Sequence, residues 1–116
     1  MNSFKILSFK HAWEGIITAF REQPNLKFHF FAALGVVFLG YLLQINQFEW
    51  IILLFLIGLV ISLELTNSAI EEIVDSFTQE HHPGAKKAKD IAAGAVLVAA
   101  ITSLIVGILI FLPYFY

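Results

Sequence analysis

The chain has 116 residues, of which 59% are hydrophobic and only 14% charged, and its three long apolar runs place it with membrane proteins. The length suits a single domain, residues 1–116, and the net charge of −2 without a dense basic tract argues against a nucleic-acid partner. The absence of cysteine excludes disulfides, thiol catalysis and cysteine-based metal centres.

Residues 2–22 are predicted to form an amphipathic helix that lies on a membrane surface. One helical stripe is apolar and the opposite face is polar, with Phe9, Trp13, Ile16, Ile17 and Phe20 on the first and Lys10, Glu14, Thr18 and Arg21 on the second. Because charge interrupts the apolar residues, the segment does not have the pattern of a cleavable signal peptide.

Three membrane-spanning helices are predicted after the break at Pro24 and Asn25, at about residues 28–45, 49–77 and 90–112. The polar turn "QINQ" (44–47) separates the first two spans. The stretch "TQEHHPGAKKAKD" (78–90) is predicted to be a polar loop with Pro83-Gly84 as its turn. The fold class is therefore an all-α membrane protein, with a surface helix and three transmembrane helices.

The basic residues predict the orientation. All seven precede either the first or the third span: Lys5, Lys10, Arg21, Lys27, Lys86, Lys87 and Lys89. The positive-inside rule places that side in the cytoplasm, so we expect a plasma-membrane protein with a cytoplasmic N-terminus and an outer C-terminus. The cytoplasmic side is also the side where ATP is found.

The segment "LELTNSAIEEIVDSF" (63–77) carries polar residues where a membrane span should be apolar. Glu64, Asn67, Glu71 and Asp75 share one helix face within roughly 80°, whereas Glu72 points elsewhere. Glu64 follows Glu49 by fifteen residues, or about 22 Å of helix, against a hydrocarbon core of about 30 Å. Glu64 is therefore expected just inside the cytoplasmic boundary of the membrane.

An ionisable residue within a span is costly and marks a functional candidate. A carboxylate at headgroup depth, followed by others nearer the cytosol, suits chemistry between a lipid and a water-soluble, metal-bound reagent. Carboxylates with an amide oxygen are ligands that Mg²⁺ prefers. For Glu72 and Asp75 taken alone, simple solvation beyond the membrane explains the charge equally well.

A second polar cluster, "KKAKD" (86–90), begins the third span. Lys86 and Lys87 are interpreted as membrane anchors, while Lys89 beside an acidic helix is a candidate phosphate ligand. The sequence contains neither GxxxxGK[ST] nor GxGxxG, so a nucleotide site must be of another kind.

The remaining candidates are interpreted structurally. The histidines show no convincing metal-binding spacing and are taken as surface or interface residues: His11, His29, His81 and His82. Small residues recur every fourth position in the third span and permit close helix packing: Ala95, Ala99, Ser103 and Gly107. Because three short spans enclose little interior, self-association is expected to complete a site between subunits.

The motifs "ELTNSAIEEIVD" (64–75) and "HPGAKKAKDIAAGAVL" (82–97) resemble the prokaryotic diacylglycerol kinase family, which includes undecaprenol kinases. The resemblance extends to "AWEGI" (12–16) and "NLKFH" (25–29) and so covers essentially the whole chain. It implies a small membrane kinase that works as a homotrimer and transfers the γ-phosphate of Mg-ATP to a lipid hydroxyl.

The resemblance also implies roles for individual residues. Glu64 falls on the catalytic base, Asn67 on a neighbouring polar active-site residue and Glu71 on a metal-binding carboxylate. Asp75, Lys89 and Asp90 match positions on the nucleotide side of the site.

The sequence departs from the family at one metal-binding position. Many members have a glutamate two residues before the Asn of "NLKFH", where this chain has Gln23 with Glu22 beside it. Either Gln23 serves as a neutral ligand, or Glu22 substitutes for the missing carboxylate, or this metal contact is weaker.

The lipid substrate has two candidates. "HP" (82–83) and "AKDIAAGAVL" (88–97) favour undecaprenol, and the alternative is diacylglycerol, whose kinases share "NSA" (67–69). A rival of another class is a non-enzymatic membrane subunit or ion-pathway component in which Glu64 carries protons. The absence of charge in residues 51–63 and 91–112 argues against that rival, because an ion pathway would place charge deeper.

Overall fold

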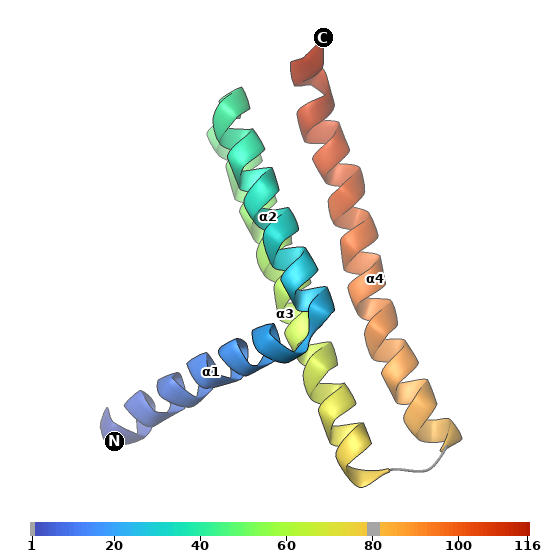
Figure 1. The fold of residues 1–116 in the computed structure, drawn as a ribbon. Helices are drawn as coiled ribbons and strands as arrows, with labels where there is room; N and C mark the ends of the chain where they lie inside the picture. The colour runs from blue at the N-terminus through green and yellow to red at the C-terminus, as the bar shows by residue number, and fades with distance from the viewer. Residues whose placement is uncertain (1, 79–81) are drawn as a thin grey trace.

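The computed structural model describes residues 2–78 and 82–116, with side chains from Ser8 onward. These residues form α1 (Asn2–Glu22), α2 (Pro24–Leu43), α3 (Gln47–Phe77), α4 (Pro83–Phe111) and a short 3-10 helix, η1 (Leu112–Phe115). The long helices α2, α3 and α4 form a bundle from which α1 projects sideways (Figure 1). The predicted all-helical class is confirmed, and three helices are long and apolar enough to cross a membrane.

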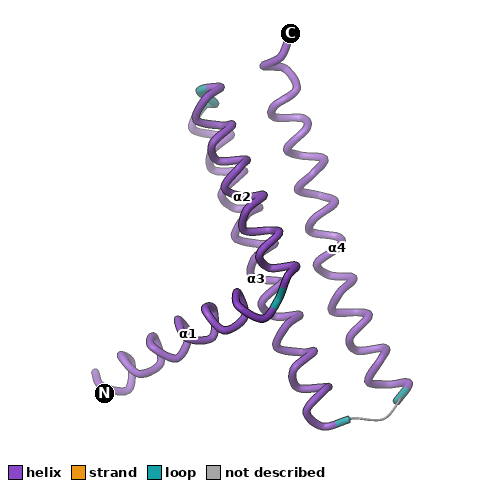
Figure 2. The backbone as a smooth tube through the Cα atoms, in the orientation of Figure 1, coloured by secondary structure: helices purple, strands orange, loops and turns teal. Residues whose placement is uncertain are grey.

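The chain turns sharply between α1 and α2 at Gln23. This residue is extended, with φ −111° and ψ 107°, and Pro24 is the first residue of α2. Proline suits the first position of a helix because it needs no N–H there, and it forces the preceding residue out of the helical region. The break predicted at Pro24 is therefore present, and it is what directs α1 away from the bundle (Figure 2).

The polar turn between α2 and α3 is built from two helix caps. Gln44 closes α2 in the left-handed conformation, with φ 55°. Asn46 then opens α3 with a capping box: its Oδ1 accepts from the Glu49 backbone N–H at 2.9 Å, and Glu49 Oε1 accepts from the Asn46 N–H at 3.1 Å. The hydroxyl of Tyr114 also donates to Glu49, which ties the end of the chain to this turn.

The core of the bundle lies near this turn. Ile45, Leu53, Ile110 and Phe111 are buried together, and Gly40 lets Trp50 approach so closely that an added Cβ would lie 3.0 Å from its ring. The central helix, α3, packs against both α2 and α4. Many large apolar side chains of α2, α3 and α4 remain exposed, as expected of helices that face lipid.

The start of α4 differs from the sequence prediction. Residues 78–90 were expected to be a polar loop, but α4 begins at Pro83. The His82 ring explains the early start, because its Nδ1 accepts from the backbone N–H groups of Gly84 at 3.1 Å and Ala85 at 3.2 Å. Pro83 and Gly84 are therefore the first turn of a helix, and "KKAKD" is helical. His81 lies outside the described residues.

The small residues of α4 only partly follow the predicted stripe. Within the chain, the buried small side chains of this helix are Ala92, Val96 and Ala99, whereas Ala95 is exposed. Ser103 and Gly107 line a cavity instead of a tight helix contact.

Candidate active site

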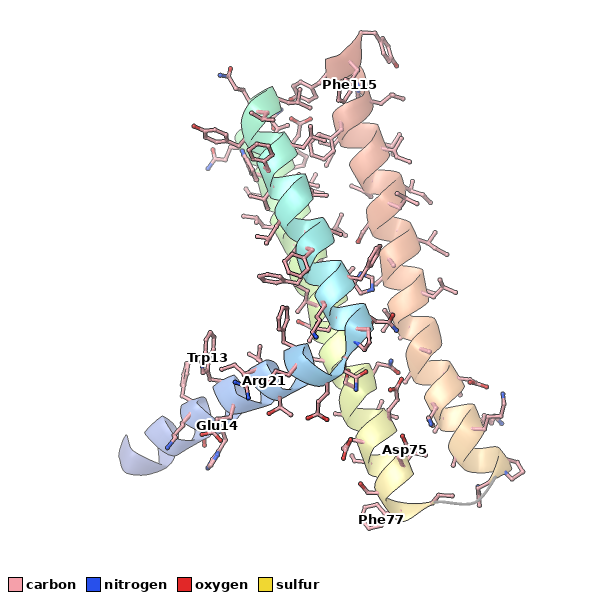
Figure 3. The ribbon with its side chains drawn as sticks, viewed as in Figure 1. Trp13, Glu14, Arg21, Asp75, Phe77 and Phe115 are labelled. Carbon is pink, nitrogen blue, oxygen red and sulfur yellow. The ribbon has the colours of Figure 1, made fainter. Side chains whose placement is uncertain are left out.

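Three polar side chains are buried among the described residues, and all three belong to one stretch of α3. Glu64 is 3% exposed, Asn67 7% and Ser68 8%. They lie directly after the apolar turns of α3, on the half of the helix that ends at Phe77. Figure 3 shows Asp75 on the same half, on the side of α3 toward α4. Burying a carboxylate is costly, so this placement marks Glu64 as the centre of the candidate site.

Glu64 has a partner that the sequence did not suggest. His29 of α2 is half-buried, and its Nε2 lies 3.7 Å from Oε2 of Glu64. His29 was interpreted as a surface or interface residue, and in the structure it lies between α2 and α3. A signal was available in the sequence: His29 lies two residues beyond Lys27, the basic flank of its span, and so at the same membrane depth as the acid at position 64.

Asn67 and Glu71 follow Glu64 on the same face of α3, one and two turns further along. The Asn67 Nδ2 donates to Oε1 of Glu71 at 3.0 Å. The amide oxygen of Asn67 is buried and has no hydrogen-bond partner among the described residues. Buried polar atoms are nearly always satisfied, so an unpartnered oxygen beside a carboxylate fits a cation ligand.

The exposed end of this face carries two ion pairs. Lys89 of α4 reaches across to Asp75 of α3, with Nζ 2.9 Å from Oδ1. Within α4, Nζ of Lys86 lies 2.6 Å from Oδ2 of Asp90. The structure thus brings Asp75 and Lys89 together, and it pairs Lys86 with a carboxylate of the same helix.

Glu22 and Gln23 lie where α1 ends and α2 begins. Both line a cleft of about 520 Å³ between α1 and α3, together with Ser68 and Glu72. Glu71 is not among the residues that line it. Within residues 2–78 and 82–116, no group of three or more histidine, aspartate and glutamate side chains is arranged to hold a metal ion. The cleft thus brings segment 22–23 beside Ser68 and Glu72 of α3.

The polar side chains on this face of α3 become more exposed from Glu64 toward Asp75. Glu64 is buried beside His29, Asn67 and Glu71 follow, and Lys89 of α4 pairs with Asp75 at the exposed end. From Glu64 to Asp75 the series extends eleven residues, or about 16 Å. Such an arrangement can accept a proton inside the membrane boundary and bind a cation and phosphates nearer water.

Comparison with known proteins gives a family for this arrangement. The family model for prokaryotic diacylglycerol kinase matches residues 10–111. The undecaprenol kinase of Bacillus subtilis is 52% identical over 106 residues, which is 91% of this chain and 86% of that protein. A diacylglycerol kinase of Synechocystis is 42% identical over 109 residues, 93% of this chain and 62% of that protein. The diacylglycerol kinase of Escherichia coli is 29% identical over 105 residues, 90% of this chain and 86% of that protein.

Proposed function

Because the chain belongs to the prokaryotic diacylglycerol kinase family and is a lipid kinase, we propose that it phosphorylates undecaprenol with ATP as the phosphate donor. The observation that carries the proposal is the buried Glu64 beside His29, at the point where the apolar part of α3 gives way to its polar end. A hydroxyl held at that depth reaches the carboxylate while its chain stays in the membrane.

The proposed chemistry needs one proton acceptor and a set of groups that position phosphate. Glu64 accepts the proton of the lipid hydroxyl as the hydroxyl oxygen bonds to the γ-phosphorus and the bond to the bridging oxygen of ADP breaks. The products are the lipid phosphate and ADP. His29 is near enough to orient the carboxylate during this step.

The residues of α3 fit a magnesium ion accompanying the nucleotide. The unpartnered oxygen of Asn67 and the carboxylate of Glu71 are the side chains that would hold it, and Glu22 or Gln23 remains a candidate third ligand. Bound Mg²⁺ would supply neutralisation of phosphate charge. We assign Asp75, Lys89 and Asp90 to the part of the site that binds the nucleotide. When the nucleotide binds, Lys89 releases Asp75 and donates to a phosphate oxygen instead.

The proposed assembly is a homotrimer in the plasma membrane. Supporting this, three spans enclose little interior, so a contact between subunits is needed to complete a site. We propose that α1 lies on the cytoplasmic surface and that the end of α4 lies outside. Supporting this, Trp13 is 65% exposed and projects to the side of α1 toward which α2 extends, whereas Glu14 projects to the other side (Figure 3).

The test is transfer of labelled phosphate from ATP to undecaprenol and to diacylglycerol, measured in parallel with purified protein in micelles. We expect undecaprenol to be the better substrate. The second candidate, diacylglycerol, is favoured by the Synechocystis and Escherichia coli relatives and would be supported by the opposite ranking. Failure to phosphorylate either lipid would overturn the proposed function.

A further inference from the structure

The connection between α1 and α2 is a single residue, Gln23. Its backbone N–H donates to the carbonyl of Ala19 at 2.9 Å, which continues the hydrogen-bond pattern of α1. Its own carbonyl accepts from the N–H of Lys27 at 3.3 Å, which begins the pattern of α2. Because both helices continue up to this residue, the angle between them depends on the φ and ψ of Gln23. Gln23 is therefore the hinge between the two helices.

The angle at this hinge also sets where the side chains of segment 22–23 lie. Both residues line the cleft between α1 and α3, opposite Ser68 and Glu72. A side chain of this length extends roughly 5 Å from its Cα, so a rotation of about 10° moves its end by about 1 Å. Metal ligands must be placed within about 0.2 Å of their usual distances. A small change in the hinge angle is therefore enough to remove a ligand from a metal site.

Three phenylalanine rings contact one another across the hinge. Phe20 of α1 lies edge to face against Phe30 of α2, with ring centroids 5.4 Å apart and 83° between the ring planes. The ring of Phe31 lies 6.4 Å from that of Phe20 and 5.6 Å from that of Phe30. All three separations are within the range of attractive aromatic pairs. We call Phe20, Phe30 and Phe31 the aromatic brace.

The brace is suited to select one angle between the helices. Among the side chains described from Ser8 onward, no hydrogen bond or ion pair joins α1 to another helix. Phe30 and Phe31 closely follow Lys27, the basic flank of the span, so the rings lie at the edge of the apolar layer. Lipid is as apolar as protein, so burial there favours no particular orientation of α1. The edge-to-face preference of aromatic rings does favour one.

We propose that the aromatic brace is a positioning element for the metal site, because it holds Gln23 at the angle that places segment 22–23 beside α3. The inference rests on the proposed function, in which one residue of this segment joins Asn67 and Glu71 as a magnesium ligand. The rings act through the backbone of Gln23 and not by contact with the ion. Each aromatic pair favours the braced angle by roughly twofold to tenfold.

The first experiment removes the ring of Phe20 and keeps an apolar side chain. We expect Phe20→Leu to raise the Mg²⁺ concentration for half-maximal activity by about twofold to tenfold, because fewer molecules have the ligand in place. The KM for the lipid should not change, and Phe20→Tyr, which keeps the ring, should restore the normal Mg²⁺ requirement. Phe9→Leu is the matched control, since Phe9 is an 83% exposed ring on the same apolar stripe of α1. Equal shifts in Phe20→Leu and Phe9→Leu would overturn the proposal.

A double-mutant cycle tests whether the rings act as a unit. Phe30→Leu removes the partner ring on α2, and it replaces Phe20→Leu as the single variant if that protein does not fold. We expect the double variant to need about as much Mg²⁺ as either single variant, because each change breaks the same contact. Phe38→Leu, at a 62% exposed ring of α2, is the control and should leave the requirement unchanged. Shifts that multiply in the double variant would contradict a shared brace.

A further experiment measures the hinge without catalysis. The chain has no cysteine, so spin labels can be attached at Lys10→Cys on α1 and Leu34→Cys on α2, both exposed positions. Labelled chains are diluted with unlabelled ones, and the distance between the labels is measured by pulsed electron paramagnetic resonance. We expect Phe20→Leu to shift or broaden the distance distribution, and Phe20→Tyr and Phe9→Leu to leave it unchanged. An unchanged distribution in Phe20→Leu would refute the brace even if the protein phosphorylates lipid.

Direct metal binding separates this inference from the proposed function. Mn²⁺ is titrated in place of Mg²⁺, with ATP and without lipid, and its affinity is expected to be about twofold to tenfold weaker in Phe20→Leu than in Phe9→Leu. A shifted hinge with unchanged Mn²⁺ affinity would overturn the link between the brace and the metal site. A shifted hinge with weakened Mn²⁺ binding, in a protein that phosphorylates no lipid, would support the link and refute the proposed function.

Discussion

Glu64 is the residue on which the proposed chemistry depends, because it is the buried carboxylate at the membrane end of the polar face. Glu64→Gln keeps its size and hydrogen-bonding capacity but cannot accept a proton. We expect kcat to fall at least about a hundredfold, the scale of general-base catalysis, while nucleotide affinity persists. Single-turnover rates and ATP binding measure the two effects separately. Near-normal turnover would assign the base to another group.

Glu22 and Gln23 are the residues for which the sequence left alternatives open. If Gln23 is a neutral ligand, Gln23→Glu should lower the Mg²⁺ concentration for half-maximal activity, because a carboxylate binds a hard cation more strongly. If Glu22 is the ligand, Glu22→Gln should raise that concentration. Since both line a cleft with Glu72, Glu72→Gln is the natural control for general loss of negative charge. An unchanged requirement in the first two variants removes this segment from the metal site.

The polar face of α3 was predictable residue by residue, and the contacts around it were not. Helical periodicity alone places Glu64, Asn67 and Glu71 on one side, and the structure shows their burial decreasing in that order. His29 was missed because its partner lies thirty-five residues away on another helix. Periodicity describes one helix at a time, whereas a pair between helices depends on how they are packed.

Helix boundaries show a similar limit at the scale of elements. The break at Pro24 was predicted because proline removes a backbone donor, and α2 does begin there. Pro83 was read as a loop signal by the same reasoning, yet it begins α4. Proline ends one helix and starts another equally well, and the deciding contact at Pro83 is the cap from His82.

The capping box at the start of α3 gives a prediction for stability. Asn46→Ala removes the side chain that accepts from the Glu49 backbone, and we expect a loss of about 1 kcal/mol in the free energy of unfolding. Activity per folded molecule should be unchanged, since the turn lies at the opposite end of α3 from Glu64. Unfolding by detergent titration measures the first effect. Gln47→Ala is the matched control, and an equal loss in both variants would contradict the role of the cap.

The whole molecule is expected to work as an assembly, and subunit mixing tests this. We expect oligomers of Glu64→Gln and Lys89→Met chains to recover part of the activity that each homogeneous variant lacks, because a site at a subunit contact can draw its base and its lysine from different chains. Activity is measured after the two variants are mixed, denatured and refolded together. No recovery, with mixed oligomers verified, would favour the arrangement seen in one chain, where Lys89 bonds Asp75.

The hydrogen bond from Tyr114 to Glu49 holds together the end of the bundle that is farther from the candidate site. It joins the last turn of the chain to the cap of α3, beside the buried core of Ile45, Leu53 and Phe111, whereas Glu64, Asn67 and Lys89 lie toward the other end. The residues that stabilise the fold and the residues proposed to act on substrate therefore lie toward opposite ends of the bundle. Substitutions around Tyr114 that raise the thermal stability of the protein are therefore expected to leave its catalytic rate unchanged.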